Sequence, residues 1–293
     1  MSLHVRTEHL KLVSGTYMRT SLRSGAGVIF LVLSMIVGLV LAGIATLPVE
    51  TLQLAAKNGQ SAQMAFNEAV AKFGPGVIEY FTNASPDTAK YWLADQPALM
   101  SLFLIMMLAF LPFLASLAGF NQTSGDIGSK GLRYLLLRTE RANIFLGRMV
   151  ATYVFTLAVV TVIFAVVAVY TVAKVPYYGT GEVLWWLLRG WFASAMFLLP
   201  WVALTAWVSA MMEFPFLSLL ISELGLVLWI VITYVMGKNV DELHNAAYAT
   251  PWGYKLWLLD PNPGMVLAGV AVMVAFTGVF TWLGLRHFDK RDL

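Results

Sequence analysis

Cysteine is absent from this 293-residue chain, which excludes disulfides, thiolate nucleophiles and cysteine-based metal sites. Charge is also scarce. Asp, Glu, Lys and Arg make up 12% of the residues, whereas a soluble globular domain carries roughly 25%. Hydrophobic residues account for 59% of the chain. This balance predicts a polytopic membrane protein.

Motifs for nucleotide binding and catalysis are missing as well. The sequence contains no Gly-x-x-x-x-Gly-Lys-Ser/Thr, and the run from Gly128 to Gly131 lacks both that spacing and a preceding strand. The histidines fall in separate loops and termini, which predicts neither a metal cluster nor a nucleophile and base pair. They are His4, His9, His244 and His287. We therefore expect no enzymatic activity and no cofactor bound by this chain itself.

Six apolar stretches are long enough to cross about 30 Å of hydrocarbon as helices, which takes about 20 residues each. They cover residues 28–47, 98–120, 149–172, 184–211, 216–236 and 265–285. Each run is continuously apolar and lacks the alternation of a membrane β-strand. The expected fold class is therefore all-α, a polytopic bundle of six transmembrane helices in a single domain that spans residues 1–293.

Lysine and arginine side chains are concentrated in three parts of the chain: residues 1–26, 121–148 and 286–293. The long connections 48–97 and 237–264 carry fewer of them. Basic residues close to the ends of membrane helices mark the cytoplasmic side. We expect a multi-pass protein of the cell inner membrane with both termini and the 121–148 connection in the cytoplasm. These basic residues are not interleaved with stacking aromatics, so we expect no nucleic-acid partner.

Three connecting segments have local patterns of their own. Residues 1–26 mix apolar and basic side chains, which predicts an amphipathic elbow helix lying along the inner membrane face. Pro75 and Pro86 stand at possible first-turn positions and predict an external helical segment within 48–97. Aromatic residues around Pro251 and Gly253 predict a short interfacial helix within 237–264.

The connection 121–148 carries the most distinctive pattern of the chain. Leu132, Leu135 and Leu136 recur at helical spacing, so they predict one apolar face on a short helix. Basic residues surround these leucines, and they are Lys130, Arg133, Arg138 and Arg141. The combination predicts a docking surface for a soluble partner. It also fits an ordinary basic cytoplasmic loop whose leucines rest on the membrane interface.

Two ionisable residues lie within the predicted spans. Arg189 is close to the start of the fourth span, and its long side chain could carry the charge outward to the interface as an anchor. Glu223 follows Pro215 by eight residues, roughly 12 Å along a helix, which is too deep for its carboxylate to reach water. We expect it to face the bundle interior, a water-filled path or a partner subunit, with either a structural or a substrate-contacting role.

Small residues recur at four-residue spacing in the first predicted span. Such a row lets a second helix approach closely, so it is a candidate dimer seam. The residues concerned are Ser34, Gly38 and Ala42.

The order of residues after the second span supplies a further clue. Asp126, Gly131, the run Leu135 to Leu137, Arg141 and Gly147-Arg148 follow one another. This series resembles the loop of permease subunits of ATP-binding-cassette exporters, the ABC type-2 family, in which an acidic residue, a glycine, a leucine run, an arginine and a closing Gly-Lys follow the second helix. Here Asp replaces the usual Glu, Arg replaces the closing Lys, and the family's Thr and Pro are missing. The C-terminal run from Phe288 to Leu293 is similar to that family's closing Phe, basic cluster and Asp-Leu.

The resemblance implies a transmembrane subunit that pairs with a second permease copy and with two separate ABC ATPase subunits. ATP and Mg would then be bound by the ATPase subunits, and this chain would form the translocation path in the lipid bilayer. The residues expected to couple to the ATPase are Asp126, Gly131, Leu132, Leu135, Leu136, Arg138 and Arg141. Two alternatives are a secondary transporter or channel, whose path Glu223 would line, and a non-transporting membrane anchor for a soluble complex.

Overall fold

The computed structural model describes residues 7–23, 86–174, 179–236 and 245–291, together with isolated helical positions between 32 and 43. Within these residues the chain is helical, without strands, which confirms the predicted all-α class. The elements are α1 (Thr7–Arg23), α4 (Pro86–Lys90), the π-helix η1 (Tyr91–Asp95), α5 (Ala98–Gly119), α6 (Ser124–Gly128), α7 (Leu132–Leu136), α8 (Arg141–Lys174), α9 (Thr180–Met211), α10 (Pro215–Ile230), its π-helical continuation η2 (Val231–Met236), the 3-10 helices η4 (Ala246–Ala249) and η5 (Pro251–Leu259), and α11 (Pro263–Lys290).

Among the residues that the structure describes, five helical stretches are long and apolar enough to cross a membrane. They are Leu99–Gly128, Arg141–Ala173, Thr180–Met211, Pro215–Thr233 and Pro263–Lys290, which correspond to the second to sixth predicted spans. The chain is therefore a multi-pass membrane protein. The predicted first span and most of the 48–97 segment lie outside the described residues.

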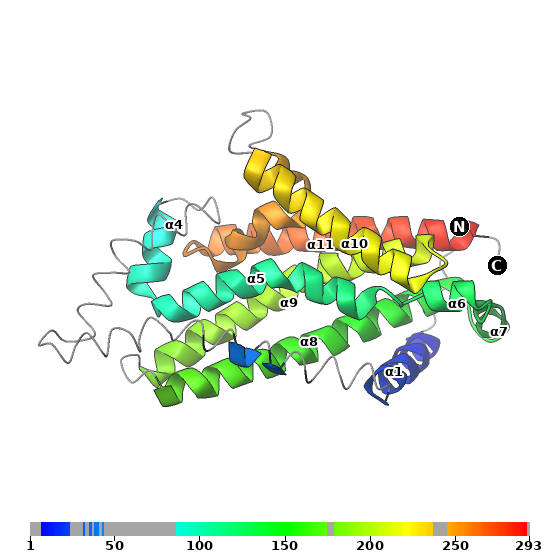
Figure 1. Ribbon diagram of the computed structural model, residues 1–293, viewed down its shortest axis with the longest axis horizontal. Coiled ribbons are helices and arrows are strands. Elements are labelled where there is room, and N and C mark those ends of the chain that lie inside the picture. Colours follow the sequence, from blue (N-terminus) through cyan, green and yellow to red (C-terminus); the bar gives the residue numbers. More distant parts are fainter. Residues whose placement is uncertain are drawn as a thin grey trace, which may run out of the picture.

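Helix α9 forms the centre of the bundle. Most of its apolar stretch is buried, and α5, α8 and α11 all pack against it. Figure 1 shows these four helices running along the long axis of the molecule, while α10 is inclined across them. Helices α1, α6 and α7 lie at the end of the molecule where α11 finishes, here called the α6–α7 end. Helix α4 lies at the opposite end, here called the α4 end.

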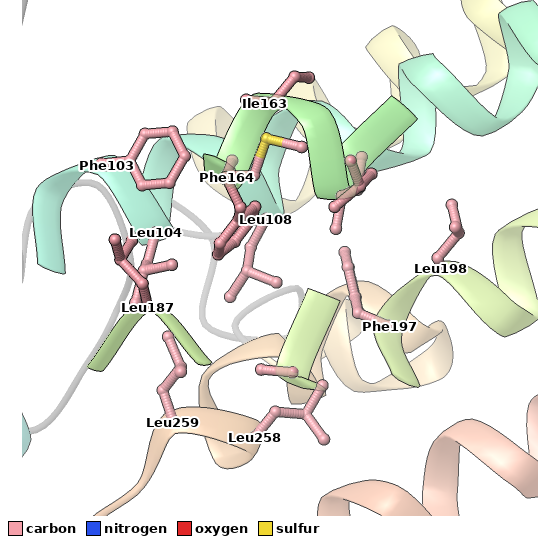
Figure 2. Close-up of a cluster of buried hydrophobic side chains, with 14 of the residues drawn as sticks. Phe103, Leu104, Leu108, Ile163, Phe164, Leu187, Phe197, Leu198, Leu258 and Leu259 are labelled. Atoms are coloured by element: carbon pink, nitrogen blue, oxygen red, sulfur yellow. The ribbon is translucent and has the colours of Figure 1, made fainter. Parts of the chain in front are cut away.

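A continuous apolar core joins the central helices at the α4 end (Figure 2). Aromatic rings meet edge to face within it, as Phe103 of α5 and Phe164 of α8 do with centroids 5.3 Å apart. Residues of η5 enter the same core, including Leu258 and Leu259, which are both 1% exposed. Lipid tails are as apolar as the side chains, so helices gain little hydrophobic free energy by associating in a membrane. Close packing of this kind therefore holds the bundle together.

Arg189 connects three segments at the α4 end. Its guanidinium donates to the hydroxyl of Tyr91 in η1, 2.9 Å away, and to the carbonyl oxygen of Asp260 before α11. The same group lies 5.3 Å from the ring centroid of Trp186. Arg189 thus ties α9 to neighbouring parts of its own chain at the α4 end, and its role as an interfacial anchor stays a prediction.

Gly38 faces the bundle of its own chain. It is buried, and a Cβ atom placed on it would lie 3.4 Å from Cγ2 of Ile163 in α8. The space beside this glycine is therefore filled by Ile163 of the same chain, and the dimer seam stays a prediction. The other two residues of that stripe, Ser34 and Ala42, lie outside the described residues.

Candidate functional site

The connection between α5 and α8 folds into two one-turn helices, α6 and α7, with a sharp turn between them. Lys130 occupies this turn with a φ angle of 59°, a left-handed conformation that costs a residue with a side chain roughly 1–2 kcal/mol. Gly131 follows directly, and α7 then begins at Leu132. The connection is thus a short, ordered projection at the α6–α7 end of the bundle, visible in Figure 1.

The inner side of α7 rests on the protein's own core. Leu132 is fully buried, and Leu136 is partly buried against the same cluster. This cluster, here called the lower core, comprises Ile127, Leu132, Ile144, Phe145, Ala206, Ala210, Leu285 and Phe288. Leu132 has no exposed surface in this conformation, and its predicted contact with an ATPase subunit stays a prediction. Its role is to hold the loop on the bundle.

The outer side of the loop presents a different set of residues to the surroundings. Tyr134 is 75% exposed and Leu137 is 83% exposed, although both are large hydrophobic side chains. Lys130 and Arg133 are exposed on the same loop. We call these four residues the outer face. The sequence analysis did not single out Tyr134 or Leu137 as contact residues, although their three-residue spacing, offset from Leu132 and Leu136, would place them together on a helix.

A buried arginine fastens this loop to α8 and α1. Arg148 of α8 is 6% exposed, and its guanidinium pairs with the carboxylate of Asp126 in α6. It also donates to the carbonyl oxygen of Gln122, 2.7 Å away, and lies 5.6 Å from the ring centroid of Tyr17 in α1. Burial raises the pKa of the Tyr17 hydroxyl, although the nearby Arg148 opposes this rise. Tyr17 therefore stays neutral beside the cation, and three elements meet at one guanidinium.

Arg141, at the start of α8, is bound to the end of α11. Its guanidinium donates to the carbonyl oxygens of Phe288, Asp289 and Arg291, at 3.0, 2.9 and 2.8 Å. The last carbonyls of a helix have no partner within the helix, and a cation at this end also meets the favourable side of the helix dipole. The guanidinium therefore caps α11 in this conformation, and the predicted contact of Arg141 with an ATPase subunit stays a prediction.

The turn between α9 and α10 joins the same assembly. Arg291 donates to the carbonyl oxygen of Ala210, 2.7 Å away, and forms an ion pair of 3.1 Å with Glu213. Gly128 of α6 approaches the backbone of Glu213 so closely that a Cβ atom at this position would clash with its carbonyl oxygen. The loop is therefore in contact with the ends of several membrane helices.

Two further predicted coupling residues point toward α1. Leu135 and Arg138 line a cleft between α1, the loop and the start of α8. Leu135 is 36% exposed, so it differs from the fully buried Leu132 although both lie on the predicted leucine stripe. Side chains of the loop thus fall into three groups, those of the inner side, the outer face and the cleft.

No model of a known protein family matches this sequence, and no curated protein shows significant similarity to it. Within the described part of the chain, no group of three His, Asp or Glu residues could hold a metal ion. The functional conclusion is therefore drawn from the geometry of the α6–α7 end.

Glu223 lies away from this assembly, on α10. Its side chain is partly buried, with the Oε1 atom covered, and it lies beside Ser116 of α5. Helix α10 packs against both α5 and α9. The carboxyl group therefore sits at a seam between helices, away from the outer face and from the cleft.

Proposed function

We propose that this chain is the transmembrane subunit of an ATP-driven exporter of the ABC type-2 class. It would pair with a second permease copy, form the translocation path, and couple at its outer face to two ATPase subunits that bind ATP and Mg. The observation that carries the proposal is the outer face itself. Tyr134 and Leu137 are exposed apolar anchors ringed by Lys130 and Arg133, the composition expected of an interface centre with a charged rim.

The connections of the loop support a role in coupling. A force applied to the outer face would pass to α8 and α1 through Asp126 and Arg148, and to the α9–α10 turn through Gly128. It would reach α11 through the lower core, which Leu132 shares with Phe288. Packed side chains are nearly incompressible, so a displacement of such a loop is carried into the helices it touches. Asp126 and Arg148 both belong to the series of residues that resembles the ABC type-2 loop. They form the ion pair that joins α6 to α8.

The positions of α1 and α5 favour a sixth span. Helix α1 lies at the α6–α7 end, whereas α5 begins at the α4 end, beside η1 and the start of α9. A sixth crossing between them is the simplest topology, and the helical residue Gly38 of that interval lies against Ile163 of α8. We propose that α1 is the elbow helix and that the α6–α7 end is cytoplasmic, because the basic residues cluster there.

Labelling of single cysteines tests this orientation. Asp95 and Ser129 are both exposed, and they lie at opposite ends of the described structure. Because the chain contains no cysteine, Asp95→Cys and Ser129→Cys each introduce a unique thiol. We expect an impermeant thiol reagent added to intact cells to label the Asp95→Cys chain and to label the Ser129→Cys chain only after lysis. The reverse pattern would invert the proposed topology.

Purification of the chain from its native membranes tests the function. We expect an ATPase with a Walker motif to co-purify in a ratio of one to one, and the complex to hydrolyse ATP. Transport by the reconstituted chain alone, driven by an ion gradient, would instead favour the secondary transporter that Glu223 could serve. A stable complex without any ATPase would favour a membrane anchor for another soluble assembly.

A further inference from the structure

A cleft of about 1000 Å³ is lined by residues of α1, of the loop and of the first turns of α8. Leu12 and Val13 of α1 and Leu135 of α7 supply the exposed apolar wall. Arg138 and Arg148 contribute positive charge, and Asp126 contributes the negative charge. The cleft therefore combines an apolar surface with a cationic side.

The two arginines of the cleft are in different states. The charge of Arg148 is offset by its ion pair with Asp126. Arg138 is exposed and forms no ion pair with a carboxylate in the described parts of the chain. Beside it, the hydroxyl of Thr139 lies 3.2 Å from Nδ1 of His9, which closes the loop against α1. The cleft thus has one cation available to a ligand, together with neutral hydroxyl groups.

We propose that this cleft binds one anionic phospholipid, with the headgroup phosphate at Arg138 and an acyl chain along Leu12, Val13 and Leu135. The choice of a lipid rests on the proposed orientation, in which α1 lies along the inner membrane face and the cleft opens at the level of the headgroups. A soluble phosphate ester could use the cation but not the apolar wall. A zwitterionic lipid could use the wall but would present its own cation to Arg138.

Binding of such a lipid would join α1 to α7 through a molecule of the bilayer. The lipid would lie between α1 and the loop, beside the ion pair of Asp126 and Arg148. The position of the loop, and with it the outer face, would then depend on the anionic lipid content of the membrane.

Lipid titration of the purified full chain in a non-ionic detergent tests the proposal without any ATPase, so its outcome is independent of the proposed function. The probes are dioctanoyl phosphatidylglycerol, dioctanoyl phosphatidylcholine and glycerol 3-phosphate, and native mass spectrometry counts the bound molecules. We expect one phosphatidylglycerol to bind preferentially. Arg138→Gln should weaken this binding on the order of tenfold, because it removes a charge-assisted hydrogen bond to phosphate.

Arg133→Gln is the matched control, because Arg133 is an exposed arginine of the same loop that does not line the cleft. It should leave the binding of phosphatidylglycerol unchanged. Thr16→Trp is the second variant, since Thr16 lines the cleft and a large ring there should displace the lipid without altering any charge. Thermal unfolding in detergent without lipid verifies that each variant is folded.

Several outcomes would overturn the proposal. Equal losses in Arg138→Gln and Arg133→Gln would indicate general attraction to a basic surface. If phosphatidylcholine bound as tightly as phosphatidylglycerol, the apolar wall alone would account for binding. If glycerol 3-phosphate bound as tightly, the ligand would be a soluble phosphate ester. If Arg138→Gln lost a co-purifying ATPase but bound phosphatidylglycerol as before, the cleft would belong to the protein interface.

Discussion

A Leu137→Asp chain is expected to lose its ATPase subunit while remaining folded in the membrane. Leu137 is 83% exposed, so its replacement removes no packing within the chain. In a complex the same side chain would be a buried apolar anchor, and a carboxylate in its place would be desolvated. Anchors of this kind contribute 2 kcal/mol or more, which corresponds to a loss of affinity of roughly 30-fold or greater.

Ser129→Asp is the control for the added charge, since Ser129 is exposed on the same loop but is not an apolar anchor. Both chains would be purified from the same cells, and the ATPase bound per permease would be measured together with ATP hydrolysis. Retention of the full ATPase complement and normal transport by the Leu137→Asp chain would show that the loop is an ordinary basic connection. The exporter proposal would then lose its main support.

The second large effect is expected at Arg148, whose replacement by methionine should destabilise the α6–α7 end. Removing one partner of a buried ion pair costs about 3–5 kcal/mol, because the other charge is left without compensation. The Asp126 side chain is 40% exposed and can recover some hydration, which lowers the expected cost to roughly 2 kcal/mol. The loss also leaves the carbonyl oxygen of Gln122 without this donor.

Thermal unfolding in detergent and the rate of proteolysis in α1 measure this effect. The double variant Arg148→Met with Asp126→Asn should be more stable than Arg148→Met alone, because it leaves no uncompensated carboxylate. Arg133→Met, which changes an exposed arginine, serves as the control and should unfold like the unmodified chain. A chain with Arg148→Met that unfolds at the unmodified temperature, with α1 equally protected, would contradict the fastening role of this ion pair.

Leu132 and Leu137 differ in burial, and the sequence does not predict this difference. The leucine spacing predicts that one side of a short helix is apolar, but it does not say whether that side meets a partner or the same chain. In the structure, Leu132 is buried in the lower core and Leu137 points away from it. The difference arises because α7 is a single turn, Leu132–Leu136, whose direction is set by the helices beneath it.

The arginines show the same limit for charge. The sequence predicts that Arg141 is a basic residue at the rim of the loop and that Arg189 is an interfacial anchor. Arg141 finds its acceptors at the end of α11, 147 residues further along the chain at Phe288, and Arg189 finds Tyr91, 98 residues away. Because these partners are distant in sequence, no local pattern predicts which arginines remain available to a ligand or partner.

The sequence by itself determined the class of this protein and the positions of its membrane-length helices from the second span onward. A long apolar run in lipid forms a helix, because a helix satisfies its own backbone hydrogen bonds and requires no partner to do so. Tertiary structure decided which residues of the loop are buried, which are exposed, and which close the cleft with α1. Those properties depend on how helices far apart in the sequence pack around α9, and on the acceptors that this packing brings within reach of each arginine.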